Sequence, residues 1–458
     1  MVKFLRRCLV LALAVSFVLG SAAWGQYTRE EVMRKRLEQL ENEVAKLRRS
    51  FGAPQQGLSR QQVQDLVRQE LEEVQGDDTF RVYWDKGLKM KTLDGNFALK
   101  IGGRVMLDYA AISADDELAS VIGSSDFEDH VQDGTEFRRA RMFMSGNVYG
   151  NTGYKLQIDF ADNEVTLKDA YLAIKELLPW SIKIGQFKEP FSLEELTSSK
   201  YITFMERAMP VSMAPSRNVG IQVSDHAMDK RMTWAIGAFW DADDSAETNT
   251  EDGAAITGRI TGLPVYAQDG AQLVHVGAGA SLRSPEEAQY KFRPNIHQAE
   301  KLLETMKVAT DSVLLVGLEA AWVCGPFSLQ GEYIQADIEG DTGDPDVDVD
   351  GYYVFASYFL TGEHRPYKTS GGSFSRVKPI NNFNPDEGGW GAWEAAARYD
   401  HVEGDVASTA EMDAITLALN WYLNPNMRIM WNYVNSTLEY SSLDADTDAF
   451  MMRFQVDF

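Results

Sequence analysis

Apolar and polar residues alternate along most of the chain. In Phe97–Tyr109 the odd positions are apolar or glycine, whereas the even positions include Lys100, Arg104 and Asp108. A period of two over such a length predicts a long strand with one apolar and one polar face. About sixteen such segments can be counted, centred near residues 103, 143, 157, 170, 183, 222, 236, 257, 277, 318, 332, 355, 396, 417, 432 and 453.

Two folds have strands that alternate in this way, a soluble β-sandwich and an outer-membrane β-barrel, and the connections between the strands distinguish them. An outer-membrane barrel needs tilted strands of roughly 9–11 residues, joined alternately by long loops and tight turns. The long connections are Ala111–Glu136, Lys188–Asn218, Asp241–Gly253, Ser284–Ser312 and Glu339–Asp350, and the tight ones include Gly150–Gly153 and Asn424–Asn426. Residues 80–458 are therefore predicted to form an all-β, antiparallel transmembrane β-barrel of about sixteen strands.

Two further features fit a barrel in an outer membrane. Tryptophans fall at or near strand ends, where an aromatic girdle lies at the membrane surface. The last strand ends on Phe458 after an alternating apolar series. These features predict that the chain is an outer-membrane protein whose long loops face outside.

One connection breaks the alternation. Thr361–Trp390 is long, yet it falls on the side of the tight turns, and it carries Arg365, Lys368, Arg376 and Lys378 among Gly, Pro and Ser. The pattern leaves two interpretations open: either a hairpin is hidden in this segment, or the segment folds into the barrel lumen.

The first 25 residues have the organisation of a secretory signal peptide. Lys3, Arg6 and Arg7 precede the apolar run Leu9–Leu19, and small residues follow before Gly25. This run is too short to span a bilayer as a helix, which needs about 20 residues. We expect the signal to direct export and to be removed.

Residues 26–79 change to a helical period. Apolar residues spaced alternately four and three apart predict a short coiled coil: Met33, Leu37, Leu40, Val44, Leu47 and Phe51. A second helix is expected to about Gln75. We interpret this region as a periplasmic, oligomerising α-helical segment, although the helix could instead pack on its own barrel.

Composition excludes several other classes of protein. With 68 Asp+Glu against 44 Lys+Arg the net charge is −24, which argues against nucleic acid as a partner. Two cysteines and six scattered histidines predict neither a disulfide scaffold nor a metal site. No nucleophile–base pair stands out, so no cofactor and no enzymatic activity are expected.

The alternation also assigns charges to the lumen. Inward positions hold twelve cations and eight acids, while most other acids fall in the loops. The cations are Lys100, Arg104, Arg139, Arg141, Lys155, Lys175, Lys183, Arg259, Arg283, Arg398, Arg428 and Arg453. The acids are Asp108, Asp159, Asp169, Glu319, Glu332, Glu394, Asp400 and Asp457. Cation-lined pores favour anions, but these cations could also simply neutralise the acids.

Several motifs resemble one family, the phosphate-selective porins O and P. They are Glu136–Arg141 (EFRRAR), Lys168–Leu172 (KDAYL), Gly185–Ser192 (GQFKEPFS), Thr203–Arg207 (TFMER), Asn420–Asn426 (NWYLNPN) and the end Phe454–Phe458. The resemblance runs from about Phe80 to Phe458 and is most specific over Gly185–Arg207.

The resemblance implies a trimeric, sixteen-stranded barrel whose inward-folded loops form a cation-lined constriction. Matched by motif, Arg138 and Arg139 lie near the constriction, with Asp169 opposite. Lys188, Ser198, Ser199 and Lys200 lie on or beside the constricting loop. Arg104, Arg141 and Lys183 complete the expected anion pathway.

Three positions do not follow simply from the resemblance. The alternation turns Arg138 toward lipid unless a β-bulge intervenes at the start of its strand. Glu194 and Glu195 place acid in the constricting loop, where a phosphate pore would be expected to carry more base.

The predicted function is passive diffusion of small inorganic anions, with phosphate or polyphosphate as candidate solutes, through a homotrimer in outer-membrane lipid. Two alternatives remain open at this point. The chain could be a general, non-selective porin, or an envelope tether attached through its coiled coil.

Overall fold

A computed structural model describes residues 80–115, 118, 133–161, 164–175, 180–243, 245–248, 253–405, 409–440 and 443–458. The chain divides into two units, Met1–Gly76 and Asp77–Phe458, and every described residue belongs to the second. The predicted signal peptide (residues 1–25) and helical segment (26–79) lie outside the described residues. Within the described ranges, no helix has the length and apolar character to cross a membrane.

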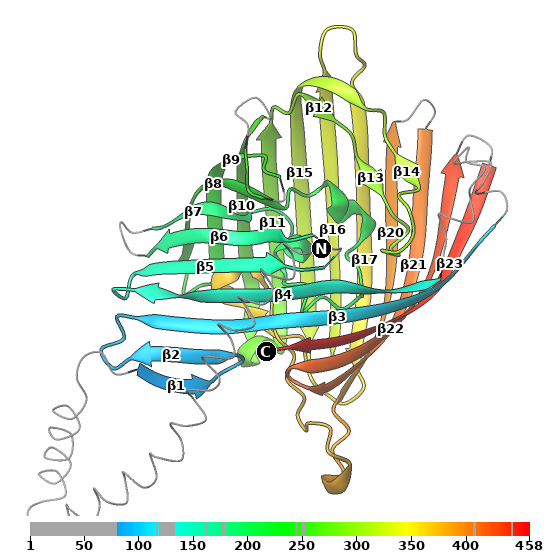
Figure 1. The fold of residues 1–458 in the computed structure, drawn as a ribbon. Helices are drawn as coiled ribbons and strands as arrows, with labels where there is room; N and C mark the ends of the chain where they lie inside the picture. The colour runs from blue at the N-terminus through cyan, green and yellow to red at the C-terminus, as the bar shows by residue number, and fades with distance from the viewer. Residues whose placement is uncertain are drawn as a thin grey trace, which may run out of the picture. The chain divides into compact units, whose positions relative to one another are not determined.

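Sixteen of the described strands form a closed antiparallel barrel (Figure 1). They are β3 (Ala98–Ala114), β4 (Gly134–Val148), β5 (Thr152–Asp159), β6 (Thr166–Ile174), β7 (Ser181–Lys188), β8 (Arg217–Ala227), β9 (Met232–Trp240), β10 (Ala254–Ala267), β11 (Gln272–Arg283), β15 (Val308–Cys324), β16 (Phe327–Gly340), β17 (Val347–Phe359), β20 (Ala392–Asp405), β21 (Thr409–Asn424), β22 (Met427–Tyr440) and β23 (Leu443–Asp457). The last strand closes the barrel on the first, with Asp457 opposite Arg104. The predicted fold is confirmed.

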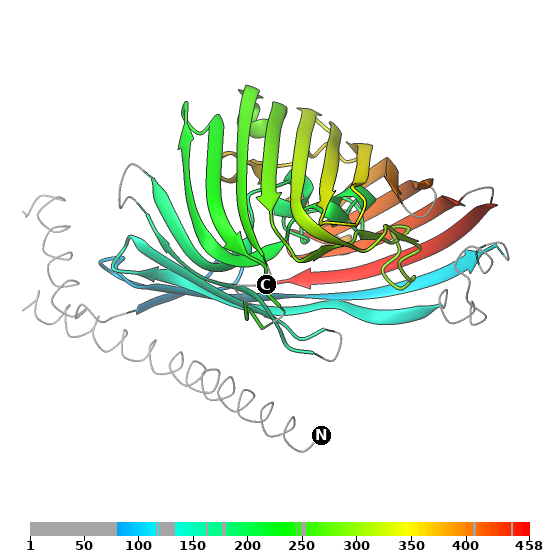
Figure 2. The same ribbon diagram turned by 90° about the horizontal axis from the view of Figure 1, so that it is seen from above.

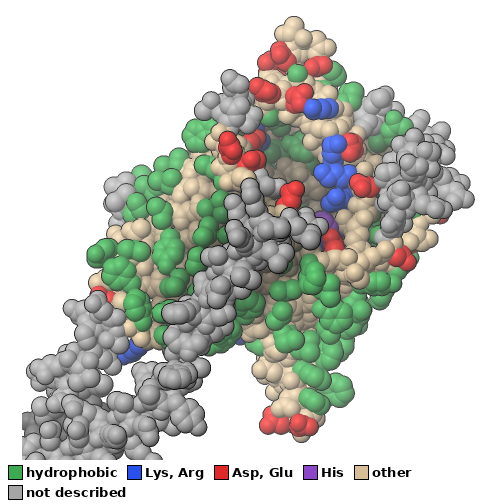
Figure 3. Space-filling view, viewed as in Figure 1, with side chains coloured by type: hydrophobic (Ala, Val, Ile, Leu, Met, Phe, Trp, Pro, Cys, Tyr) green, Lys and Arg blue, Asp and Glu red, His purple; other side chains and the backbone are tan. Residues whose placement is uncertain are grey.

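The outer face of the wall is apolar, whereas the inner face carries buried polar side chains together with an apolar cluster that packs against the inward loop. On β21, Ile415 and Leu417 are about half exposed on the outward face, whereas Thr416 and Asn420 are fully buried on the inward face. This arrangement is the reverse of a soluble protein, because the outward face meets lipid. Figure 3 shows the resulting hydrophobic side chains over the outer surface.

A hairpin that the sequence analysis missed precedes the barrel. β1 (Phe80–Trp84) pairs with β2 (Leu88–Thr92), and β2 pairs with the start of β3, where Leu88 lies opposite Ile101. Both strands are only five residues long, so their alternation is too short to detect.

The connection between β7 and β8, residues 189–216, folds into the lumen and is named the inward loop (Figure 2). It contains α5 (Leu193–Leu196) and the short 3-10 helix η1 (Met209–Met213). Its backbone reaches the far wall, where the Met209 N–H donates to Asp400 at 3.2 Å.

The connection between β11 and β15 also reaches inward. It carries the two-residue strands β12 (Glu287–Ala288), β13 (Lys291–Phe292) and β14 (Leu303–Glu304). The Asn295 side chain donates to Asp400 at 2.9 Å. Two loops from the same end of the barrel thus meet on one wall carboxylate.

Residues 361–378, named the luminal strap, also fold into the lumen. The strap contains β18 (Tyr367–Lys368), the 3-10 turn η3 (Thr369–Gly371) and β19 (Ser373–Phe374). The Tyr367 hydroxyl lies 2.7 Å from Nδ1 of His275, and Arg259 donates to the Gly372 carbonyl at 2.8 Å. Residues 361–378 of the predicted segment Thr361–Trp390 therefore contain a small hairpin and fold into the lumen, whereas its remaining residues project from the barrel.

The Arg365 guanidinium is a main anchor of the strap. It lies 3.7 Å from the ring centroid of Phe374 and 5.0 Å from that of Phe355, and it donates to Gln330 at 3.1 Å. A buried cation–aromatic contact of this kind contributes about 2 kcal/mol.

We expect Arg365→Ala to release the strap from the wall and to raise single-channel conductance and open-channel noise in planar bilayers. Lys378→Ala is the matched control, because Lys378 is an exposed cation at the end of the same strap. Equal conductance traces for the two variants would contradict this role of Arg365.

Candidate functional site

Arginines gather where β3 and β4 pair. Arg104 and Arg141 lie directly opposite each other across the two strands, and Arg139 lies opposite Met106. Directly opposite side chains have Cβ atoms about 4.5–5.5 Å apart, so the positive charges lie close together. Arg104 and Arg139 are both buried.

A β-bulge turns Arg138 into the lumen. The register of β3 and β4 shifts between Met106 and Leu107, so that Arg139 pairs with Met106 and Phe137 with Leu107. The residue between them, Arg138, then points inward like Arg139 and forms two 2.9 Å hydrogen bonds to Glu206. The lipid-facing assignment from simple alternation was wrong, and the bulge is its physical cause.

Glu206 is the ionic anchor of the inward loop. It pairs with Arg138 on β4 and, at 2.8 Å, with Arg453 on β23. Burial opposes its ionisation, but Arg138, Arg139 and Arg453 together hold the pKa of Glu206 well below its usual range. The loop therefore binds the wall as a carboxylate.

Backbone carbonyls of the loop take up further wall arginines. Arg398 on β20 donates to the Glu206 carbonyl at 2.9 Å, Arg428 on β22 donates to that of Ile202 at 2.8 Å, and Arg453 donates to that of Met205. These contacts confirm that the three arginines face inward. They also show that much of the cationic wall serves to position the loop.

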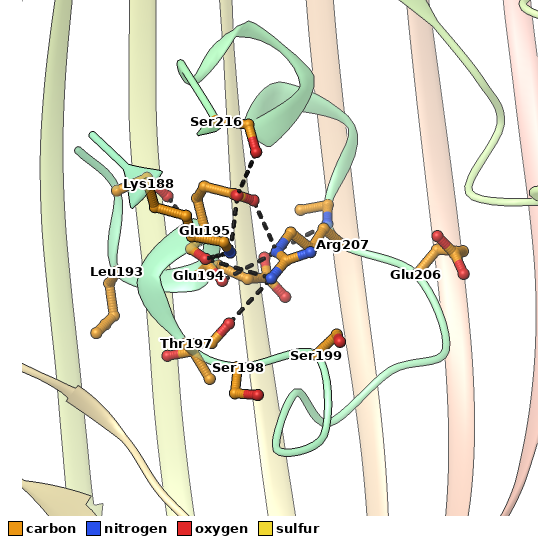
Figure 4. A network of polar contacts seen from close by, with 12 residues as sticks. Lys188, Leu193, Glu194, Glu195, Thr197, Ser198, Ser199, Glu206, Arg207 and Ser216 are labelled. Atoms are coloured by element: carbon orange, nitrogen blue, oxygen red, sulfur yellow. Dashed lines mark hydrogen bonds and ion pairs between the residues drawn. The ribbon is translucent and has the colours of Figure 1, made fainter. Parts of the chain in front are cut away.

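The two adjacent acids of the loop serve its own fold (Figure 4). Glu195 pairs with Lys188 at 2.7 Å and with Arg207 at 3.1 Å, and Arg207 also donates to the Glu194 carbonyl at 3.0 Å. Burial would raise the pKa of Glu195, but Arg207 and Lys188 lower it to about 2. Because Glu194 and Glu195 are only 2% and 6% exposed, neither presents an open negative charge to the passage.

Glu332 was not singled out as a site residue, although it holds α5 in place. Its carboxylate on β16 accepts hydrogen bonds from the backbone N–H groups of Leu193 and Glu194 at 2.9 and 2.7 Å. Such N–H groups at the start of a helix lack partners within the helix. The pairing joins residues more than 130 positions apart, so no local sequence signal reveals it.

The loop serines meet the arginine group. Arg104 Nη1 donates to Ser199 at 2.6 Å and lies 3.5 Å from the Ser198 hydroxyl. Arg139 contacts the Met106 sulfur at 3.7 Å, and its Nε has no hydrogen-bond partner among the described residues. In the part of the chain that the structure describes, no carboxylate lies within ion-pair distance of Arg104 or Arg139.

Lys200 shares one acid with a cation of the strap. Its Nζ lies 3.2 Å from Asp457, which also pairs with Arg376. Burial lowers the pKa of Lys200 to about 8. Asp457 opposes this shift, whereas Arg104 and Arg376 add to it.

Asp169 does not stand alone opposite the arginines. It accepts from Lys155 at 2.6 Å and from Arg217 at 3.0 Å. Lys183 lies 4.6 Å from the Phe187 ring centroid and 5.3 Å from that of Tyr171. Asp169 is thus neutralised by two cations.

A cavity of about 570 Å³ lies beside this region, at the end of the barrel with the tight turns. Its lining includes one acid, Asp225, and five cations: Lys175, Lys183, Lys188, Arg259 and Lys368. Lys368 comes from the strap, which sequence reasoning could not assign to one location. The arginine group and these lysines together make a markedly cationic lumen.

The family model of phosphate-selective porin O and P matches residues 99–458. The chain belongs to this family. Porin O of Pseudomonas aeruginosa is 29% identical over 421 residues, which cover 81% of this chain and 91% of the relative. The porin also resembles an uncharacterised Caulobacter vibrioides protein, 28% identical over 74% of this chain and 68% of the relative.

Solved porin structures share the fold. The anion-selective porin from Comamonas acidovorans superposes with a TM-score of 0.51 at 13% identity, covering 78% of this chain and 99% of that one. OmpT of Vibrio cholerae gives 0.50 at 9% identity, covering 79% and 98%. Family membership and fold identify the chain as an outer-membrane porin.

One group of described residues could hold a metal ion. Ligand atoms of His401, Glu403 and Glu411 lie within 4.8 Å of one another. They lie on the outward face of β20 and β21, since their neighbours Asp400 and Val402 are fully buried inward. The group is separate from the arginine pathway, and His401 already contacts Asp413 at 2.9 Å.

We expect Glu206→Gln to increase anion selectivity. The substitution removes a negative charge that offsets Arg138, Arg453 and the nearby Arg139, so the reversal potential in a salt gradient should shift toward the anion equilibrium potential. Because a charged hydrogen bond contributes about 1.5–3 kcal/mol, the loop should also lose thermal stability. Glu387→Gln, an exposed carboxylate far from the loop, is the control, and equal reversal potentials would contradict the assignment.

We expect anion selectivity to fall between pH 7 and 9. A lysine is charged below its pKa, so Lys200 loses its positive charge as the pH rises through about 8. Reversal potentials measured from pH 6 to 10 should show this step, and Lys200→Arg should make it smaller because arginine stays charged. An unchanged step in Lys200→Arg would assign the titration to another group.

Proposed function

We propose that this porin conducts small inorganic anions by passive diffusion and that phosphate is among them. The observation that carries the proposal is the pair Arg104 and Arg139. Both are buried on the inward face of the wall, and Arg104 lies beside the serines of the inward loop. Neither forms an ion pair with a described carboxylate.

A cation that has no carboxylate partner in a narrow lumen attracts anions strongly. The low dielectric of the surrounding wall strengthens Coulomb attraction relative to open water, and rings of arginine and lysine serve anion and phosphate pores. A cation that is paired with a carboxylate attracts anions much less, because the neighbouring negative charge cancels its field at short range.

The residues also suit a tetrahedral oxyanion. The planar guanidinium of arginine matches phosphate oxygens with two parallel hydrogen bonds, and the hydroxyls of Ser198 and Ser199 can donate to the same oxygens. Chloride is a single atom, so it cannot offer two oxygens to the parallel donors of one guanidinium. Phosphate is therefore expected to bind more tightly and to slow chloride.

The charges of the two inserted segments support this proposal. The inward loop holds four acids against two bases, but its acids Glu189, Glu194, Glu195 and Glu206 are buried or paired. The strap holds four cations, Arg365, Lys368, Arg376 and Lys378, against Glu363 alone. The acidic loop thus contributes structure. The strap adds Lys368 to the cationic cavity, whereas its Arg376 pairs with Asp457.

The proposed trimer rests on the family resemblance, and the orientation and the roles of residues 1–79 rest on the sequence pattern. We propose a homotrimer whose long loops face outside and whose tight turns face the periplasm. In this arrangement residues 1–25 act as the export signal and residues 26–79 as a periplasmic helical segment. The general porin remains the second candidate, favoured by the number of cations that are paired.

The test measures the reversal potential in a planar bilayer under a chloride gradient, with phosphate added as a competitor. We expect anion preference and a chloride current that phosphate reduces. Arg104→Gln should weaken phosphate block roughly tenfold, since a charge-assisted hydrogen bond contributes about 1.5–3 kcal/mol. Arg231→Gln, which removes an exposed arginine at the turn end, should leave it unchanged.

Each outcome of this experiment decides one alternative. Cation preference would contradict the anion pathway, and chloride current undiminished by phosphate would leave an anion pore without phosphate binding. Deleting residues 27–75 tests the alternative of an envelope tether. If the protein is a pore, the deletion variant keeps its single-channel conductance. If it is a tether, cells with the variant form envelope blebs.

A further inference from the structure

The strap continues into a projection at the turn end of the barrel. Residues 379–391, named the turn-end finger, extend below β17 and β20 (Figure 1). The finger is well ordered internally. Asn384 and Gly389 exchange backbone hydrogen bonds of 3.0 and 2.8 Å around the 3-10 turn η4 (Pro385–Glu387).

The finger exposes large apolar side chains. Trp390, Ile380 and Phe383 are 72%, 66% and 38% exposed, whereas the tip carries the acids Asp386 and Glu387. Figure 3 shows hydrophobic side chains along one side of this projection, continuous with those on the outer surface of the barrel above, and acidic groups at its end.

This apolar side continues a row of stacked tryptophans on the outward face. Trp393 lies 5.1 Å from Trp421 and 6.3 Å from Trp431, measured between ring centroids, with nearly parallel planes. Phe383 meets the edge of Trp421 at 5.0 Å.

The finger is bonded to this row through its backbone. The Trp390 carbonyl accepts from the Trp421 indole at 2.8 Å and from the Trp393 indole at 3.3 Å. Phe383 N–H donates to the Leu423 carbonyl at 2.6 Å, which fixes the base of the finger on β21. Its apolar side is therefore fixed next to the wall that faces lipid.

We propose that the turn-end finger is a membrane-surface anchor, with Ile380, Phe383 and Trp390 seated at the headgroup boundary of the inner leaflet and the acidic tip in water. Tryptophan favours this boundary because its ring is apolar and its indole N–H is polar. Lipid is the partner that this side is proposed to contact, because the finger is continuous with the lipid-facing wall. The Trp390 carbonyl is bonded to the indoles of two of the stacked tryptophans on that wall.

The proposed anchor would also affect the lumen, because the finger follows the strap directly in the sequence. Glu363 in the strap accepts from the backbone N–H of Ile380 at 2.8 Å. Seating the finger in the leaflet would hold the end of the strap, and with it the cations that the strap places in the lumen. The inference rests on the outer-membrane placement of the barrel and not on its selectivity.

Spin labels at single cysteines test the anchor in the full-length protein. Cys8→Ser and Cys324→Ser remove both native cysteines, and Ile380→Cys, Trp390→Cys and the control Asp386→Cys then each carry a nitroxide in proteoliposomes. We expect labels at 380 and 390 to be relaxed more by oxygen than by an aqueous nickel chelate, and the label at 386 to show the opposite order.

Two results would overturn the proposal. If the labels at 380 and 390 were relaxed more by the nickel chelate than by oxygen, as expected for the label at 386, the whole finger would lie in water. Labels shielded from both reagents would show that protein covers this side. Heat-modifiable migration on SDS gels confirms that each variant is a folded barrel, and Val377→Cys, buried at the end of the strap, supplies a shielded reference.

Discussion

The ion pairs of Glu206 hold the rest of the lumen in place. Glu206 joins the inward loop to Arg138 on β4 and to Arg453 on β23, and Arg453 also pairs with Asp108 on β3, across the seam where the barrel closes. One partly buried carboxylate thus connects the loop to both sides of the closure. The positions of Ser198 and Ser199, and so the surroundings of Arg104, depend on this connection.

The lumen divides its cations between structure and passage. Arg398, Arg428 and Arg453 donate to backbone carbonyls of the loop, and Lys188 and Arg207 neutralise Glu195. Arg104 and Arg139 are left without such partners among the described residues. A count of charges on the wall therefore does not predict selectivity, because selectivity depends on which cations stay unpaired.

Alternation along the chain was enough to predict the barrel, because each strand carries its own period of two. It could not predict the orientation of Arg138, which depends on the register between two strands. Nor could it predict that Glu194 and Glu195 are buried or that Arg207 pairs with Glu195, since that contact requires the folded loop. The strap was recognised as an exception, and its pairing of Tyr367 with His275 joins residues far apart in sequence.

Anomalous diffraction from crystals soaked in arsenate, a close analogue of phosphate, tests most directly whether unpaired arginines form the anion pathway. We predict an arsenic peak in the lumen within hydrogen-bond distance of Arg104 and the loop serines, and its loss in Arg104→Gln. The account would be contradicted if this site stayed empty at saturating arsenate, or if the arsenic peak were equally strong in Arg104→Gln.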